Sequence, residues 1–257
     1  MDRIQKLFSE KEKEILSVYF TAGYPKKDSI AEVIKNLSDA GVDMIEIGIP
    51  FSDPMADGPV IQASSNIALN NGITQELIFE QLKEIRKVTN IPLILMSYLN
   101  TAMQFGFELY CQKAVEVGID GLIIPDIPLE EYETNYKPIA EKYGLKFILL
   151  ITPETSEERI RKIDTISSGF IYMVSSASTT GTQSSFNEQK IDYFKRIADM
   201  KLQNPTLVGF GISNKETFNS ACSYSRGAIV GSAFIKALTS EPTIKQAVDL
   251  LIKQLKE

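Results

Sequence analysis

The stretch Asp43-Met-Ile-Glu-Ile-Gly-Ile-Pro-Phe-Ser-Asp-Pro-Met-Ala-Asp-Gly-Pro59 joins an apolar strand to a proline-rich loop. Every second residue from Ile45 to Ile49 is an isoleucine, which is the period-two pattern of a buried strand. The same alternation places Glu46 on the other face, with no charged neighbour in the strand. Because an unpartnered buried ion is costly, and because shifted pKa values gather where protons are transferred, Glu46 is a candidate acid or base.

The loop after this strand supplies further acidic groups. Its three prolines, at positions 50, 54 and 59, exclude a regular helix or ladder, and it contains Asp53 and Asp57. Glu46 and Asp57 are therefore expected to converge near one strand end. The alternative is structural: Glu46 in a core ion pair, and Asp57 as the cap of a helix or turn.

The composition predicts one domain that spans residues 1–257. The chain has 44% hydrophobic residues, enough for a large core, and no Pro/Gly/Ser-rich linker. Apolar runs such as Phe147 to Ile151 are too short to cross a bilayer, and the charged N-terminus lacks an export signal. Cys111 and Cys222 have no Cys-x-x-Cys spacing, so we expect buried free thiols and a reducing, cytoplasmic setting.

Charge and residue usage exclude several functions. The net charge of −6 and the lack of a Lys/Arg-rich stripe argue against a nucleic-acid partner. The sequence contains no histidine, which excludes catalytic triads with histidine, histidine-ligated metals and imidazole bases. Proton transfer must therefore use carboxylates, tyrosines, lysines or cysteines.

Eight apolar runs, each followed by a helical pattern, predict a single-domain (β/α)8 TIM barrel with extra helices. A doubly wound open sheet is the competing architecture. The expected strands are Leu16–Thr21, Met44–Ile49, Leu93–Tyr98, Leu122–Pro125, Phe147–Ile151, Phe170–Val174, Thr206–Gly209 and Ala228–Val230.

Amphipathic stretches lie between these strands, and several end at a glycine such as Gly41, Gly118 or Gly144. Residues 60–71 read as an extra helix before the second barrel helix. The expected barrel helices include Asp28–Ala40, Thr74–Val88, Phe107–Val117, Glu130–Tyr143 and Glu157–Ile166.

In a barrel of this kind the chemistry lies at the C-terminal ends of the strands. The residues expected there are polar or glycine: Thr21, Glu46, Tyr98, Asn100, Asp126, Thr152, Ser175, Gly211 and Ser232. No strand has a lysine in its C-terminal half, so a Schiff-base mechanism has no candidate nucleophile.

Two glycine turns predict a phosphate site. Gly209-Phe-Gly211 follows the seventh strand, and Gly231-Ser232 follows the eighth directly before a helix. Small residues let backbone amides approach an anion, and a helix N-terminus adds a favourable dipole. The uncharged loop from Ser175 to Ser185 is a candidate lid, or an ordinary solvated connection.

Several of these motifs together resemble the tryptophan synthase alpha subunit family over almost the whole chain. They are Glu46 to Pro59, Thr21-Ala-Gly-Tyr-Pro25, Met96-Ser-Tyr-Leu-Asn100, Pro125-Asp-Ile-Pro128, Val208-Gly-Phe-Gly-Ile-Ser213 and Ile229-Val-Gly-Ser-Ala233. The resemblance implies a lyase that cleaves indole-3-glycerol phosphate to indole and glyceraldehyde 3-phosphate in tryptophan biosynthesis, without metal or cofactor of its own.

The resemblance also implies roles for single residues. The catalytic positions that it implies are Glu46, Asp57 and Tyr172. The phosphate-binding positions are Gly181, Gly211, Gly231 and Ser232, and the substrate-lining positions are Tyr19, Ile123 and Phe210. Thr180 and Asp126 belong to the lid and its facing loop, while Pro50, Asp53 and Asn100 match contacts with a beta subunit.

The expected partner is a tryptophan synthase beta subunit carrying pyridoxal phosphate, in an alpha2-beta2 tetramer. One departure from the family pattern lies in the lid, where Ser176 and Ser178 replace an arginine and a glycine. Two other functions stay open: a phosphosugar isomerase or metal-dependent aldolase with Asp53 and Asp57 as ligands, and a scaffold subunit that has lost activity.

Overall fold

Eight parallel strands close into a barrel in chain order, from β1 to β8 and back to β1. The computed structural model describes residues 2–175 and 186–257. The predicted TIM barrel is confirmed, and the doubly wound open sheet is excluded because β8 pairs with β1. The strands are β1 (Ile15–Thr21), β2 (Met44–Gly48), β3 (Leu93–Met96), β4 (Gly121–Ile123), β5 (Lys146–Ile151), β6 (Ile171–Val174), β7 (Thr206–Gly209) and β8 (Gly227–Val230).

The alternation of side chains along β1 and β2 divides the core into two layers. Val18, Phe20 and the isoleucines of β2 pack outward against the helices. Tyr19 and Met44 belong instead to a second cluster that fills the barrel interior. Since Tyr19 pairs with Glu46 in the register of the two strands, the same period carries Glu46 into the interior.

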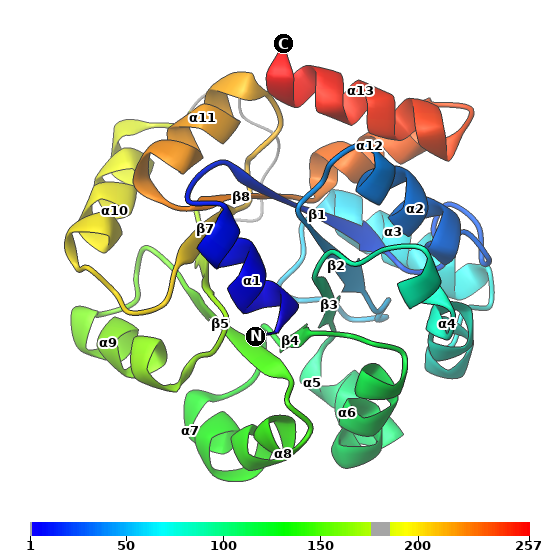
Figure 1. Cartoon of the computed structure of the whole chain (residues 1–257), viewed down its shortest axis with the longest axis horizontal. Helices are drawn as coiled ribbons and strands as arrows, with labels where there is room; N and C mark the ends of the chain where they lie inside the picture. Colours follow the sequence, from blue (N-terminus) through cyan, green and yellow to red (C-terminus); the bar gives the residue numbers. More distant parts are fainter. Residues whose placement is uncertain (1, 176–185) are drawn as a thin grey trace.

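The helices form a ring around the strands, and Figure 1 shows the barrel enclosed on all sides. Most barrel helices agree with the sequence-based expectation, but Thr74–Val88 divides into α4 and η1, and Glu130–Tyr143 contains a π-helical turn, η2. The helical elements are α1 (Arg3–Glu10), α2 (Ile30–Asp39), α3 (Pro59–Asn70), α4 (Gln75–Leu82), η1 (Ile85–Lys87), α5 (Leu99–Phe105), α6 (Phe107–Glu116), α7 (Leu129–Glu131), η2 (Tyr132–Tyr136), α8 (Lys137–Lys142), α9 (Glu157–Ile166), α10 (Glu188–Asp199), α11 (Lys215–Tyr224), α12 (Ser232–Ser240) and α13 (Ile244–Lys256).

Helix α1 crosses the N-terminal end of the barrel, as Figure 1 shows, and was not expected from the charged N-terminal sequence. Its apolar residues Ile4, Leu7 and Phe8 lie at helical spacing and join the interior cluster. The rings of Phe8 and Phe170 lie 6.0 Å apart between centroids. The helix therefore closes the bottom of the barrel, with Lys6 and Glu10 exposed on its outer face.

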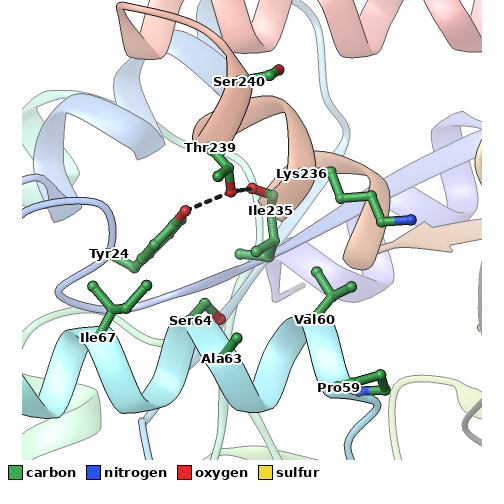
Figure 2. Close-up of a pocket in the computed structure, with 10 residues that line it drawn as sticks. All are labelled: Tyr24, Pro59, Val60, Ala63, Ser64, Ile67, Ile235, Lys236, Thr239 and Ser240. Carbon is green, nitrogen blue, oxygen red and sulfur yellow. Dashed lines mark hydrogen bonds between the residues drawn. The ribbon is translucent and has the colours of Figure 1, made fainter.

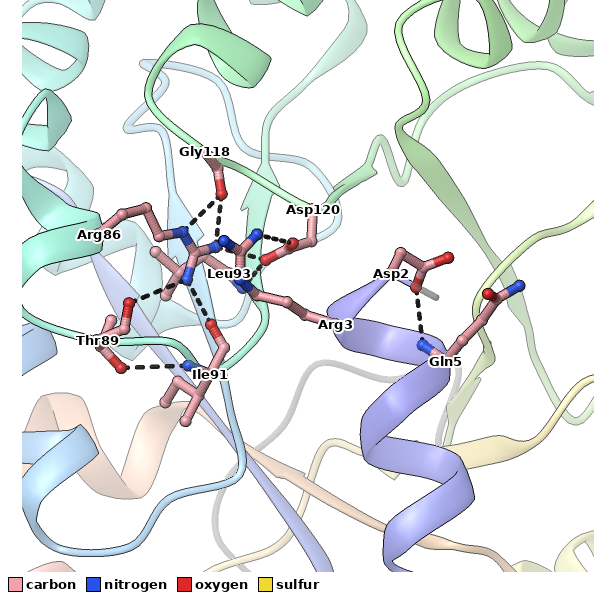
Figure 3. A network of polar contacts seen from close by, with 9 residues as sticks. All are labelled: Asp2, Arg3, Gln5, Arg86, Thr89, Ile91, Leu93, Gly118 and Asp120. Carbon is pink, nitrogen blue, oxygen red and sulfur yellow. Dashed lines mark hydrogen bonds and ion pairs between the residues drawn. The ribbon is translucent and has the colours of Figure 1, made fainter.

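A network of charged groups holds this closed end (Figure 3). Asp120, just before β4, accepts hydrogen bonds from the guanidinium of Arg3 at 2.9 Å and from that of Arg86 at 2.5 Å. Its second oxygen also accepts from the backbone N–H of Leu93, at 2.8 Å. The network links α1, η1, β3 and β4 at the end of the barrel opposite to the predicted chemistry.

The structure also bears on the expectations about the two cysteines and about membrane-spanning segments. Cys111 in α6 and Cys222 in α11 are both buried, and neither forms a disulfide. Within residues 2–175 and 186–257, the longest helices are too short and too polar to traverse a lipid bilayer.

Candidate active site

Glu46 is an interior carboxyl group with a single hydrogen-bond partner among residues 2–175 and 186–257. It is 0% exposed, and its Oε1 accepts a hydrogen bond from the hydroxyl of Ser17 at 2.8 Å. Its Oε2 has no partner, and Glu46 makes no ion pair, within the described chain, so the core ion-pair alternative is wrong. Burial raises the pKa of Glu46 from 4.5 to about 8, although the Ser17 hydrogen bond opposes the shift. Glu46 is therefore protonated at neutral pH.

Asp57 is the second buried carboxyl group, and a tyrosine holds it. The hydroxyl of Tyr98 donates to Asp57 Oδ2 at 3.0 Å, and the N–H of Ala56 donates to the same hydroxyl at 3.0 Å. The ring of Tyr98 stacks on Phe51 at 5.2 Å between centroids. Burial raises the pKa of Asp57 to about 6, and the Tyr98 hydrogen bond lowers it. Because α3 is capped by Gly58, the helix-cap alternative for Asp57 is wrong.

Two tyrosines complete the interior. The pKa values of Tyr19 and Tyr172 both lie well above 10, first because of burial and then because each ring interacts with Glu46 and Asp57. Both tyrosines therefore stay protonated and neutral. Glycines leave room for them: a Cβ atom at Gly48 would lie 2.1 Å from the Tyr19 hydroxyl, and one at Gly209 would lie 2.2 Å from the Tyr172 hydroxyl.

The walls around the two carboxyl groups are apolar and aromatic. Ile123 on β4 and Phe210 after β7 belong to the same interior cluster as Tyr19 and Tyr172. The rings of Tyr172 and Phe210 meet edge to face, 6.3 Å apart between centroids and 72° between planes. The two carboxyl groups thus lie among apolar and aromatic side chains, which suit the binding of a flat apolar ring.

Comparison with known proteins agrees with this geometry. The family model described as tryptophan synthase alpha chain matches residues 5–256. The tryptophan synthase alpha chain of Parabacteroides distasonis is 59% identical over 257 residues, covering 100% of both chains, and that of Bacteroides thetaiotaomicron is 57% identical over 256 residues, also 100% of both. The chain belongs to the tryptophan synthase alpha chain family. The crystal structure of tryptophan synthase subunit alpha from Legionella pneumophila is 33% identical, with a TM-score of 0.89 over 99% of this chain and 97% of that one.

Three of the four phosphate-binding positions expected for a tryptophan synthase alpha chain lie on the turns after β7 and β8. Gly211 has a φ of +79°, and the preceding Phe210 has a φ of 69°. The Phe210 carbonyl accepts a hydrogen bond from the Ser175 hydroxyl at 2.6 Å, which fastens this turn to the end of β6. Ser232 is the first residue of α12, whose N-cap is Gly231. The amides of a first helical turn have no partner within their helix.

The lid and partner positions have mixed outcomes. Gly181, Thr180, Ser176 and Ser178 lie outside the described residues. Asp126 is exposed, and its carboxylate accepts from the N–H of Leu99 at 2.8 Å, at the start of α5.

The three expected beta-subunit contacts differ in exposure. Asp53 and Asn100 are exposed, but Pro50 is buried in this chain. Asn100 was also expected at the end of a strand, and this was wrong, because β3 ends at Met96 and Asn100 lies in α5. Met55 is 91% exposed, and Met103 on α5 is exposed as well.

The metal-ligand alternative for Asp53 and Asp57 receives no support. Asp53 is exposed and accepts from the Ser52 hydroxyl, while Asp57 is buried beside Tyr98. Across residues 2–175 and 186–257, no three His, Cys, Asp or Glu side chains gather closely enough to bind a metal ion.

A groove of about 480 Å³ lies outside the barrel, between α3 and α12 (Figure 2). Val60, Ala63 and Ile67 of α3 line one side, and Ile235 of α12 lies across from them. The Tyr24 hydroxyl, also on the wall, hydrogen-bonds with the Thr239 hydroxyl at 2.6 Å. The groove contains neither of the two carboxyl groups and is separate from the candidate active site.

Sequence reasoning missed the residues that support the site. Ser17 was not singled out, although it shares the interior face of β1 with Tyr19, two residues later. Tyr98 was recognised only as a polar residue at a strand end. The polar residues at positions 17, 19 and 21, alternating with apolar ones, were the available signal.

Proposed function

We propose that Glu46, Asp57 and Tyr172 carry out the alpha reaction of tryptophan synthase in this chain. The chain is a carbon-carbon lyase of tryptophan biosynthesis that cleaves indole-3-glycerol phosphate to indole and glyceraldehyde 3-phosphate. The observation that carries the residue assignment is the contrast between the two buried carboxyl groups. At neutral pH Glu46 retains a proton that it can give, whereas Asp57, with a pKa of about 6, is mostly ionised.

The reaction needs both protonation states. Glu46 delivers its proton to indole C3, and the ring nitrogen becomes positively charged. The Asp57 carboxylate balances this charge, which exists only after the proton has moved. The Glu46 carboxylate then takes the proton from the hydroxyl of the adjacent carbon. The carbon-carbon bond breaks, its electron pair returns to the ring to form indole, and the carbon becomes the aldehyde. Tyr172 supplies a neutral wall beside Glu46.

The substrate phosphate is assigned to backbone amides after β7 and β8, at Gly211, Gly231 and Ser232, together with Gly181. A helix N-terminus and small residues favour an anion there. Replacing Gly211 by valine is expected to raise KM for indole-3-glycerol phosphate about tenfold or more, because its φ of +79° disfavours a branched side chain. Indole binding, measured by direct titration, should be unchanged; equal losses for both ligands would contradict the assignment.

No cofactor is assigned to this chain, because the carboxyl groups can perform every proton transfer in the proposed sequence. Pyridoxal phosphate is assigned to the beta subunit alone. A cytoplasmic location is also proposed, in accord with the two free, buried cysteines.

Members of this family form a complex with a beta subunit. We assign the contact to the loop of residues 51–58 and to α5, where Met55, Met103 and Asn100 are exposed. Tyr98 joins the two segments, since it precedes α5 and bonds to Ala56 and Asp57. Docking there can therefore position Asp57. The assembly is proposed to be an alpha2-beta2 tetramer.

The deciding experiment is an assay of indole-3-glycerol phosphate cleavage across a titration with a pyridoxal-phosphate beta subunit. Slow turnover by the isolated chain and a higher kcat in the complex are expected. An inactive scaffold subunit would show no turnover in either state. An unchanged kcat in a demonstrated complex would contradict the coupling but not the reaction, and light scattering of the same mixture measures the stoichiometry.

A further inference from the structure

Ser17 is a polar residue at a depth of the barrel where its neighbours are apolar. It is 0% exposed, and in the strand register it lies opposite Met44 on one side and Ile229 on the other. Since Met44 precedes Glu46 by two residues in β2, Ser17 is nearer than Glu46 to the closed end of the barrel. Its hydroxyl reaches Glu46 Oε1 at 2.8 Å.

This contact makes the two oxygens of Glu46 different. Oε1 is tied to β1 from the closed side of the barrel, whereas Oε2 has no partner among the described residues. When the serine hydroxyl donates to Oε1, the proton of the neutral acid resides on Oε2. After the proton has left, the same donor stabilises the carboxylate. One hydroxyl can thus select the reactive oxygen and ease the release of its proton.

We propose that Ser17 is a positioning residue for the alpha reaction, which holds Glu46 so that Oε2 faces the substrate with the transferable proton. The inference rests on the proposed role of Glu46 as the acid and base. Ser17 itself does not contact the substrate. Ser17 affects the reaction indirectly, by setting the orientation and the acidity of Glu46.

The ionisable groups around Glu46 define what a change at Ser17 can do. Tyr19 on β1 and Tyr172 on β6 interact electrostatically with Glu46, and Asp57 interacts with both tyrosines. The two tyrosines stay neutral, and the raised pKa of Glu46 results from burial, with Ser17 as the opposing influence. Removing the Ser17 hydroxyl must therefore raise the pKa of Glu46 further and make its proton harder to transfer.

The test compares Ser17→Ala with Ser17→Thr, which retains a hydroxyl and suits a strand. Ser97→Ala is the matched control, because Ser97 is also buried but hydrogen-bonds to Tyr110 of α6, on the helix side of the sheet. For Ser17→Ala in the complex with the beta subunit, kcat should fall roughly 10- to 100-fold with KM changed by less than about threefold. The basic limb of the pH profile of kcat should move upward by about one pH unit. Ser17→Thr should restore both quantities, and Ser97→Ala should change neither.

A direct titration makes the test independent of turnover. Carbon-13 NMR of glutamate-labelled protein, with the Glu46 signal assigned by its loss in Glu46→Gln, should show a higher midpoint in Ser17→Ala than in the wild type. If Ser17→Ala does not fold, Ser17→Cys replaces it, since a thiol is a similar-sized but weak donor. A wild-type kcat and pH profile in the variant, or a kcat loss without a shift in either titration, would overturn the proposal. Failure of wild type itself to cleave indole-3-glycerol phosphate would instead overturn the proposed function.

Discussion

Asp120 and Glu46 are carboxyl groups at different depths of the same barrel, and their surroundings are opposite in kind. Asp120, at the closed end, receives two guanidinium groups and a backbone N–H (Figure 3). Glu46, toward the open end, receives only the Ser17 hydroxyl and keeps one oxygen without a described partner. Asp120 therefore has enough cationic and N–H partners to stabilise its charge, and its role is to join parts of the fold.

The different surroundings of Asp120 and Glu46 show that Glu46, and not Asp120, destabilises the fold at the pH where it is expected to act. A carboxyl group with few donors in an apolar interior stays protonated, and this lowers the stability of the fold at neutral and basic pH. An apolar side chain of similar size would avoid that cost. Glu46 is therefore best explained by the proton that it carries, and Asp120 by the elements that it joins.

The largest expected effect is on catalysis by Glu46→Gln. The amide keeps the shape of the side chain but has no transferable proton, so kcat should fall by about 10³- to 10⁴-fold. The variant should stay folded, with a melting temperature at neutral pH no lower than that of wild type. Steady-state assays beside thermal denaturation check both halves, and a variant that keeps more than a few per cent of kcat would remove the acid and base assignment.

The next effect concerns the other carboxyl group of the site. Asp57→Asn should lower kcat about 10²- to 10³-fold, because a neutral amide no longer balances the charge on the indole nitrogen. KM should change little. A variant with normal kcat and raised KM would show that Asp57 is a ground-state contact.

At the closed end, Asp120→Asn should act on stability instead. Removing the charge leaves Arg3 and Arg86 facing each other without a counterion, so the free energy of unfolding should fall by about 3 kcal/mol. The kcat of the folded variant should stay within about twofold of wild type. Asp39→Asn is the control, because its ion pair with Lys35 is exposed and should be worth about 0.5 kcal/mol or less in urea unfolding. If the two substitutions lowered the free energy of unfolding equally, Asp120 would contribute no more to stability than an exposed ion pair.

The smallest effect is a pH dependence. The pKa of Glu46 is about 8 in the folded chain and near its ordinary value of 4.5 when unfolded, so between these values the folded state holds the extra proton. Stability from this group is complete below pH 4.5 and is lost as the pH rises through 8. Relative to Glu46→Gln, wild type should lose on the order of 2 kcal/mol between pH 5.5 and 7. Parallel stability curves for the two proteins would indicate that Glu46 is already ionised at pH 5.5.

Much of the architecture was predictable because it follows local rules. The apolar period identified all eight strands within two residues or so at each end, and Gly41, Gly118 and Gly144 mark helix ends with positive φ values. The catalytic residues were named because a lone glutamate in an apolar strand is anomalous and because the motif from Glu46 to Pro59 is specific. Helix α1 was missed because the charged and polar residues of the N-terminal segment obscured its three apolar residues.

The sequence by itself determined which residues enter the barrel interior, because side chains alternate along a strand and parallel strands stay in register. Only the tertiary structure decided what each interior group contacts. Ser17 and Glu46 are 29 residues apart, and Tyr98 and Asp57 are 41 apart. Hydrogen bonds over such separations depend on the stagger between neighbouring strands and on the path of the loop before α3. Burial in the folded barrel raises the pKa of Glu46 to about 8 and that of Asp57 to about 6, each against the lowering effect of its hydrogen bond, and the difference gives two similar side chains different roles.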